Sequence, residues 1–270
     1  VLERLARHER AARPPAAPRP QRLGDRPLTL SYHQVGDYLE CPARYRFAHV
    51  IRIPTPPSHA LVYGKALHAA VQAFHRRQMG GGRMTLEDLL AAFDDNWESV
   101  GFLTRAHEDA RRAAGREALA RFWREQQLDP ARPAAIEQEF AFQFGVDRVR
   151  GRYDRVDRDD DGRVTITDYK SSDVRDPATA NRRARESLQL GIYALAYEAA
   201  HGRVPDELAL HFLDSGIVGR SHADERRLER VRERVLTAAE GIRSGEFAAR
   251  PSLAQCGYCP FREICPDALR

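Results

Sequence analysis

Hydrophobic positions recur with a helical period along most of the first half of the chain. The spacing predicts three helices, over residues 60–78, 85–99 and 104–127. Thr85 is placed to cap the second of them. A shorter pattern over residues 31–48 predicts a helix that Pro42 interrupts, because proline lacks the backbone N–H that the helix interior needs.

The second half of the chain changes from a helical to an alternating pattern and back. Three segments predict a meander of antiparallel strands, over residues 137–149, 150–157 and 163–170. Helical spacing returns at 183–200 and 223–244, with a strand at 207–213 between them. The expected fold class is therefore α/β (mixed α+β), with a central mixed β-sheet flanked by helices.

The composition divides the chain into a tail and a body. Residues 1–28 hold five prolines, five alanines and seven arginines, which predicts a flexible linker or tail, and residues 29–270 form one large domain. The net charge is +4. The tail supplies all of it, because the other 242 residues hold 36 basic and 36 acidic side chains. The basic balance is therefore weak evidence for a nucleic-acid partner.

Two kinds of segment are not found in the sequence. No apolar run approaches the length of about 20 residues that a membrane-spanning helix needs, so no membrane role is expected and a cytoplasmic location is predicted. No Gly-x-x-x-x-Gly-Lys-Ser/Thr segment is present, so the chain has no phosphate loop of a P-loop motor.

Candidate chemistry gathers on two predicted strands. One carries Gly151-Arg152-Tyr153-Asp154, and the next ends in Asp168-Tyr169-Lys170. Carboxylates from neighbouring strands make an all-oxygen site that suits Mg²⁺ or Mn²⁺, and a lysine beside them can orient water or stabilise a phosphate. Asp-x-Lys is a short pattern, and the alternative is an exposed strand whose Asp and Lys form surface ion pairs.

The four cysteines form a second constellation. Cys41 precedes Pro42, and Cys256, Cys259 and Cys265 follow near the C-terminus with C-x2-C-x5-C spacing. A reducing cytosol disfavours disulfides, which leaves metal binding as the leading explanation. Four thiolates suit zinc or a [4Fe–4S] cluster equally well, and the spacing alone favours zinc as the commoner structural metal.

The strand motif resembles the core of the PD-(D/E)XK nuclease superfamily, in its RecB-like branch. Two further segments resemble elements of that family, Gly64-x-x-x-His68 and Gln189-x-x-x-Tyr193. Each has an ordinary explanation, since His68 can be a structural helix histidine and Gln189 and Tyr193 are neighbours on one helical face. Glu139 stands where some relatives carry an acidic residue. The order of the motifs is more specific than any one of them.

The resemblance implies a restriction-endonuclease-like core that hydrolyses DNA phosphodiesters as an exonuclease, on single strands or on strands unwound by a helicase. The metal ligands it implies for Mg²⁺ or Mn²⁺ are His68, Asp154, Asp168 and the Tyr169 carbonyl. Lys170 would position or activate water, and Gln189 and Tyr193 would hold the substrate or the lysine.

The resemblance also changes the expectation for the cysteines. RecB-like nucleases of the AddB type, and related CRISPR-associated exonucleases, carry one distant cysteine before the core and three after it, which implies a [4Fe–4S] cluster joining the two ends of the domain. It further implies a role in DNA repair and recombination, with a UvrD-like helicase motor in cis or in trans. The alternatives are an inactive DNA-binding or scaffolding domain and a zinc-stapled interaction module.

Overall fold

The computed structural model describes residues 26–128 and 133–269. In chain order its elements are β1 (Thr29–Leu30), α2 (Tyr32–Glu40), α3 (Pro42–Tyr45), η1 (Arg46–Ile51), α4 (His59–Met79), α5 (Leu86–Asp95), α6 (Arg105–Leu128), β2 (Pro133–Phe144), β3 (Asp147–Arg158), β4 (Val164–Lys170), α7 (Pro177–Glu186), α8 (Leu188–His201), β5 (Glu207–Phe212), β6 (Ile217–Ser221), α9 (Glu225–Ser244) and α10 (Leu253–Gly257). The predicted tail falls outside these residues except at 26–28. Leu28 already belongs to the fold, because its N–H donates to Asp147 Oδ1 at 2.8 Å.

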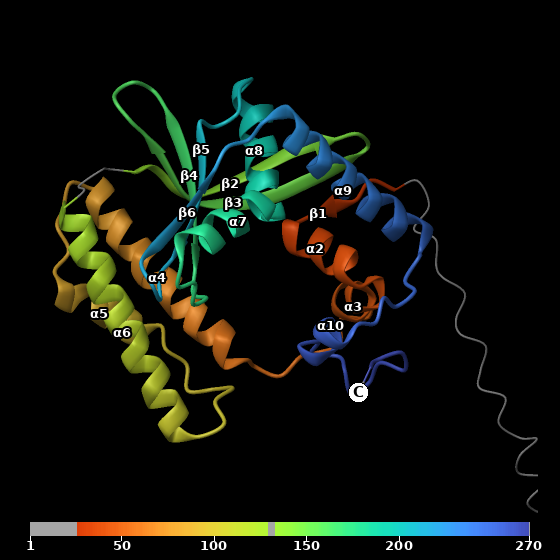
Figure 1. Ribbon diagram of the computed structural model, residues 1–270, viewed down its shortest axis with the longest axis horizontal. Helices are drawn as coiled ribbons and strands as arrows, with labels where there is room; N and C mark the ends of the chain where they lie inside the picture. Colours follow the sequence, from red (N-terminus) through yellow and green to blue (C-terminus); the bar gives the residue numbers. More distant parts are fainter. Residues whose placement is uncertain (1–25, 129–132, 270) are drawn as a thin grey trace, which may run out of the picture.

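Within the described residues, six strands form one sheet, which is mixed as the sequence predicted (Figure 1). β1 runs parallel to β3 and β4 parallel to β5, whereas the other pairs are antiparallel. β2 follows one edge of β3 along nearly its whole length. β1 and β4 share the other edge, pairing with residues 148–149 and 155–158. Residues 150–154 of β3 therefore face an opening in the sheet between β1 and β4.

The strand boundaries correct the sequence prediction at one point. The segment over 137–149 was expected to continue as one strand, but the chain turns at Gly145 and Val146, and Phe144 pairs with Asp147 across a two-residue hairpin. Gly145 has φ +59°, a backbone conformation that such hairpins require and that glycine adopts without strain. Because the chain turns here, β3 begins at Asp147 and is long enough to pair with β1 near its start and with β4 near its end.

The helices of the first half follow the predicted pattern. α4, α5 and α6 lie where the spacing placed them, and Thr85 caps α5 through a reciprocal pair of hydrogen bonds with Asp88. The predicted helix over 183–200 is instead two helices. Ser187 ends α7 and begins α8, because its hydroxyl accepts the Leu190 N–H at 3.2 Å.

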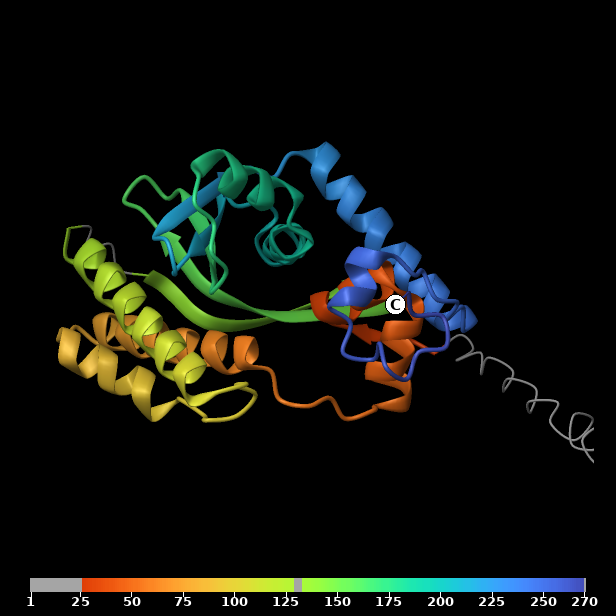
Figure 2. The ribbon, with the colours of Figure 1, turned by 60° about the horizontal axis from the view of Figure 1, so that its bottom comes forward.

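Two apolar cores hold the sheet between helices. α8 is buried on nearly all sides, as its almost continuous apolar sequence requires, and it packs in the larger core with β3, β4, β5, α2 and α9. A second core joins α4, α5 and α6 and includes Tyr169 of β4 and Leu213. Figure 2 shows the long β2–β3 hairpin passing from the α4–α6 group to the α2, α3 and α10 group.

Short elements at the two ends were not all foreseen. α2 and α3 confirm the interrupted helix, since Cys41 is extended with φ −158° and Pro42 begins the next helix. β1, β6 and α10 were missed, because two to five residues carry too little periodicity to read. No helix in the described ranges is long and apolar enough to cross a membrane.

Candidate active site

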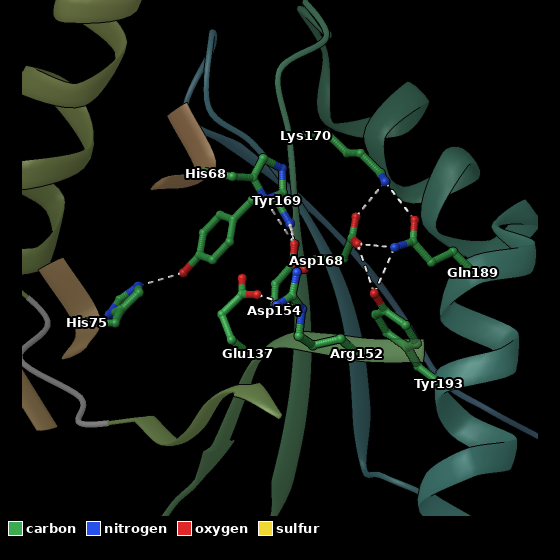
Figure 3. Close-up of polar contacts among 10 residues, drawn as sticks. All are labelled: His68, His75, Glu137, Arg152, Asp154, Asp168, Tyr169, Lys170, Gln189 and Tyr193. Carbon is green, nitrogen blue, oxygen red and sulfur yellow. Dashed lines mark hydrogen bonds and ion pairs between the residues drawn. The ribbon is translucent and has the colours of Figure 1, made fainter. Parts of the chain in front are cut away.

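The predicted carboxylate pair lies where β3 and β4 begin to diverge (Figure 3). The strands pair with Arg155 opposite Thr167, so Asp154 and Asp168 follow at the same end of the ladder. The Tyr169 backbone N–H donates to Asp154 Oδ2 at 2.9 Å, which fixes the first carboxylate beside the second strand. Asp168 is only 1% exposed. Its burial excludes the alternative of a surface ion pair.

A network from α8 surrounds Asp168. Lys170 Nζ lies 2.7 Å from Asp168 Oδ2, a buried oxygen without a partner in hydrogen-bond geometry, and donates to Gln189 Oε1 at 2.7 Å. The Gln189 amide nitrogen donates to Asp168 Oδ1 and, at 2.7 Å, to the Tyr193 hydroxyl. Gln189 and Tyr193 do contact each other along the helix. Both also reach β4, so the network orients the lysine and the carboxylate together.

α4 brings His68 to the opposite side of the pair. His68 Nδ1 lies 3.5 Å from Asp154 Oδ2. The close approach of α4 to the end of β4 depends on Gly64, where a Cβ would stand 3.2 Å from the Ser171 hydroxyl oxygen. Burial lowers the pKa of His68, so the imidazole is neutral near pH 7 and keeps a lone pair available.

Gly151 performs a similar packing function on β3. It pairs directly with Phe140 of β2, whose ring lies across the glycine, and a Cβ there would stand 2.5 Å from the ring. The Phe140 ring continues onto Tyr153, 4.7 Å away between centroids, and Tyr153 packs against Tyr193. The glycine therefore lets an aromatic stack brace the strand immediately before Asp154.

Glu137 is a site residue that the sequence did not reveal. It stands on β2 opposite Asp154, with φ +50°, a strained value for a residue with a side chain. Its carboxylate pairs with Arg152 at 2.7 Å, and its charge adds to the rise in the pKa of Asp154 that burial and Asp168 cause. Glu139, the acidic residue singled out in the sequence, is exposed and lines the cavity. The charge on this strand was visible, but the unusual φ was not.

The electrostatics of the carboxylate pair are compatible with a bound cation. Burial, and after it the charge of Asp168, raises the pKa of Asp154 well above the usual range for a carboxyl. Among the described residues, no three His, Cys, Asp or Glu side chains converge closely enough to hold a metal ion by themselves. Asp168 Oδ2, which faces only the Lys170 ammonium and accepts no hydrogen bond, and the destabilised Asp154 carboxylate nevertheless fit a divalent cation, because it would offset their negative charge.

The seven predicted site residues share one cavity of ≈1180 Å³. They are His68, Asp154, Asp168, Tyr169, Lys170, Gln189 and Tyr193. Ser31, Tyr32 and His33 at the start of α2 form another part of its wall, and Arg148, Arg150 and Arg152 of β3 line it as well. The cavity coincides with the opening in the sheet between β1 and β4.

Tyr169 connects this site to a buried polar cluster behind β4. Its hydroxyl lies 2.8 Å from His75 Nε2 and 3.4 Å from an Arg155 guanidinium nitrogen. His211 packs against the same ring, with centroids 5.5 Å apart. The cluster was not predicted, because it depends on which elements of α4, β3, β4 and β5 meet. It anchors the residue whose backbone N–H holds Asp154.

The four-cysteine cluster expected from the resemblance is not observed. All four cysteines are free, and together they line a small cavity between the α2–α3 junction and the C-terminal segment. The Arg250 backbone N–H donates to Cys41 Sγ at 3.5 Å. The thiols thus come from both ends of the domain, as predicted, but within residues 26–128 and 133–269 they do not converge into a metal-holding group.

Comparisons with known proteins agree with the geometry. The Gene 69 protein of Mycobacterium phage D29 is 25% identical over 268 residues, covering 87% of this chain and 96% of the phage protein. The Gene 69 protein of Mycobacterium phage L5 is 24% identical over 286 residues, covering 87% and 95%. The crystal structure of the "Putative exonuclease" from Eubacterium rectale shares the fold, with a TM-score of 0.53 at 13% identity over 90% of this chain and 89% of that one.

The family itself is shown by the sequence profile of the PD-(D/E)XK nuclease superfamily. The profile matches residues 29–266, which include the motifs on β3 and β4, the α4 histidine, the α8 pair and all four cysteines. The match spans almost the whole domain that the structure describes. The chain therefore belongs to the PD-(D/E)XK nuclease superfamily.

Proposed function

We propose that this chain is a metal-dependent deoxyribonuclease that works as an exonuclease on single-stranded or unwound DNA. The observation that carries the proposal is the buried Asp168 carboxylate, 2.7 Å from the Lys170 ammonium and beside Asp154, in a cavity of ≈1180 Å³. Superfamily membership supports phosphodiester hydrolysis as the reaction. The same arrangement argues against an inactive scaffold, which has no need for a buried lysine–carboxylate network.

Each residue of the site has a defined task in this proposal. His68, Asp154 and Asp168, with the Tyr169 carbonyl, would hold Mg²⁺ or Mn²⁺, which would supply positive charge for the phosphate and make a water molecule more acidic. Lys170, held by Gln189, presents an ammonium that can orient the attacking water and stabilise charge on the phosphate. Tyr193 fixes Gln189 in turn.

Substitution of the network tests the proposal directly. We expect Asp168→Asn and Lys170→Ala to lose at least about a hundredfold in the rate of DNA cleavage, the usual effect of removing one charge-stabilising group. Asp173→Asn is the matched control, because Asp173 is an exposed carboxylate just beyond β4 and pairs with Arg175. Full activity in Asp168→Asn would overturn the assignment. DNA binding by the wild-type chain without cleavage in Mg²⁺ or Mn²⁺ would favour the scaffold.

The mode of cleavage is tested with labelled oligonucleotides. An exonuclease releases short products from the 5′ or the 3′ label of a linear strand and leaves a circular strand intact. Cutting of the circle would replace the exonuclease proposal with an endonuclease. A role in DNA repair and a partnership with a helicase stay predictions from the family resemblance.

We also infer that the four cysteines bind a metal, with a [4Fe–4S] cluster as the expected group. The support is that Cys41 and the three C-terminal cysteines line one cavity although more than two hundred residues separate them in sequence. A metal held by thiolates from both ends would stabilise the domain by closing that loop. Iron and sulfide in anaerobically purified protein would support the cluster. Zinc in place of iron would support metal binding with a different metal. Protein that contains neither zinc nor iron would overturn the inference.

A further inference from the structure

β3 presents a row of alternate arginines to the active-site cavity. Arg148, Arg150 and Arg152 lead to Asp154 in steps of two residues, or about 6.6 Å along a strand. Arg152 is paired with Glu137. Arg148 and Arg150 are exposed and form no ion pair with any residue that the structure describes. These two, the first basic arm, are free to meet negative charge in the opening between β1 and β4.

A second group of arginines lies beyond the other side of the site. Arg185 of α7 and Arg230 and Arg234 of α9 line a hollow of ≈300 Å³. All three are exposed, and none has an ion pair among residues 26–128 and 133–269. These three form the second basic arm. Arg227 in the same hollow is buried and engaged by Ser221 and backbone carbonyls, so it is a structural residue.

Adjoining hollows lie between the two arms, and these hollows together are called the depression. A third hollow, of ≈460 Å³, shares Tyr32, His33 and Gln189 with the active-site cavity. The same hollow shares Ser187 and Arg234 with the hollow of ≈300 Å³ that the second basic arm lines. The depression therefore runs from β3, past the carboxylates and the start of α2, to α9.

An aromatic pair lies in the middle of this depression. The rings of Tyr32 and His33 are 3.8 Å apart between centroids and tilted by 34°, and both line the cavity. His33 is exposed, and Tyr32 is half-buried because one part of its side chain packs against the larger core. Exposed aromatic faces between basic residues are the combination that binds unpaired bases, because each base offers a face for stacking and each phosphate a charge.

We propose that a single DNA strand follows this depression across the active site. Its phosphates contact the first basic arm on one side and the second basic arm on the other, and one unpaired base stacks on Tyr32 and His33. This inference rests on the proposed function and specifies its substrate as single-stranded. It also explains how a body with equal numbers of acidic and basic residues binds DNA, since the path gathers arginines that have no acidic partner.

The salt dependence of binding tests the two arms. The affinity of the full chain for a fluorescently labelled oligo-dT of thirty nucleotides would be measured by anisotropy, in EDTA, between 50 and 200 mM NaCl. Each lost phosphate contact lowers the log–log salt slope by about 0.7 for a single strand. The double variants Arg148→Ala/Arg150→Ala and Arg230→Ala/Arg234→Ala each lose two contacts, so we expect each slope to be smaller than that of wild type by about 1.4. Between 50 and 200 mM NaCl, wild type should therefore lose about sevenfold more affinity than either variant. Arg158→Ala/Arg163→Ala, exposed arginines on the β3–β4 hairpin outside the cavity, is the control.

Stacking and chemistry are tested separately. Tyr32→Ala/His33→Ala should weaken oligo-dT binding about tenfold, whereas Tyr32→Phe keeps the ring and the affinity. Equal binding of a duplex and of oligo-dT by wild type would overturn the single-strand assignment. Unchanged salt slopes in both arm variants would overturn the path.

A small substrate separates failure of the path from failure of the proposed function. Hydrolysis of bis(p-nitrophenyl) phosphate, which reaches only the reacting centre, should proceed at the wild-type rate in both arm variants, while KM for oligo-dT rises. A wild-type chain that cleaves neither substrate would remove the nuclease assignment, and the salt slopes would still decide the path.

Discussion

Mild acid should destabilise this protein through two buried histidines behind β4. His75 hydrogen-bonds the Tyr169 hydroxyl, and His211 packs on the same ring. Burial, assisted by the positive charge of Arg155, lowers the pKa of His75 to about 3 and the pKa of His211 to about 4. Both side chains are therefore neutral in the folded state throughout the range in which a histidine of the unfolded chain, with a pKa of about 6.5, takes up a proton.

The direction and size of the effect follow from this difference in proton binding. Between pH 6.5 and the folded-state pKa, the unfolded chain binds more protons than the folded one, so stability falls as the pH is lowered. At about 1.4 kcal/mol per pH unit and proton, going from pH 7.5 to pH 5 costs about 2 kcal/mol for each histidine, or about 4 kcal/mol together. This is a large part of the stability of a typical domain.

Urea unfolding at a series of pH values, in EDTA, measures the effect. In His75→Gln the amide can still reach the Tyr169 hydroxyl but does not titrate, so the loss between pH 7.5 and pH 5 should be smaller than in wild type by about 2 kcal/mol. His222→Gln, which replaces an exposed histidine, should keep the wild-type profile. Carboxylates titrate in all three proteins and cancel in the comparison. Parallel profiles for wild type and His75→Gln would refute the reasoning.

Three further predictions concern packing, charge and metal binding. Gly151→Ala should lower the free energy of unfolding in urea by about 1–3 kcal/mol, because the added Cβ meets the Phe140 ring. Gly36→Ala, within α2 and with open space around it, should raise that free energy by about 0.5–1 kcal/mol. Equal effects of the two substitutions would contradict the packing account. Arg243→Ala should cost about 3 kcal/mol, since it removes the cation 2.6 Å from the buried Asp147 carboxylate and leaves it only the Leu28 N–H, and a change below 1 kcal/mol would count against this. Mg²⁺ or Mn²⁺ should raise the melting temperature of wild type but not of Asp154→Asn. The rise should be larger at pH 8 than at pH 6, because the raised pKa of Asp154 makes protons compete with the metal. A rise in melting temperature that does not depend on pH would contradict that competition.

The parts of the fold that sequence predicts well are those set by local spacing. α4 and α6 were found within about one residue, and the α5 cap was predicted at Thr85, which the structure shows hydrogen-bonded to Asp88 three positions later. The hairpin at Gly145 was missed for a physical reason. A turn of two residues does not interrupt the alternation of Phe140, Phe142, Phe144 and Val146, so periodicity cannot locate it.

The same distinction between local and non-local causes decides which residues of the candidate site the sequence could predict. Asp168 and Lys170 could be predicted because a strand places alternate residues on one side, and the order of the motifs then pointed to His68 and Gln189. Glu137 could not, because its place in the site depends on a φ value that no residue type encodes. The basic arms could not either, since β3, α7 and α9 contribute arginines that only the folded chain brings to one path.

Tyr169 is the residue through which core and active site act on each other. Its N–H holds Asp154, its neighbours in sequence are Asp168 and Lys170, and its ring is fixed by the two neutral histidines. Below pH 6.5 the histidines weaken the fold, whereas rising pH charges Asp154 beside Asp168 and makes the metal-free site repulsive. A bound divalent cation would remove only the repulsion between the two carboxylates. Metal should therefore move the pH of maximum stability upward, toward the range in which Asp154 is charged and the proposed chemistry can proceed.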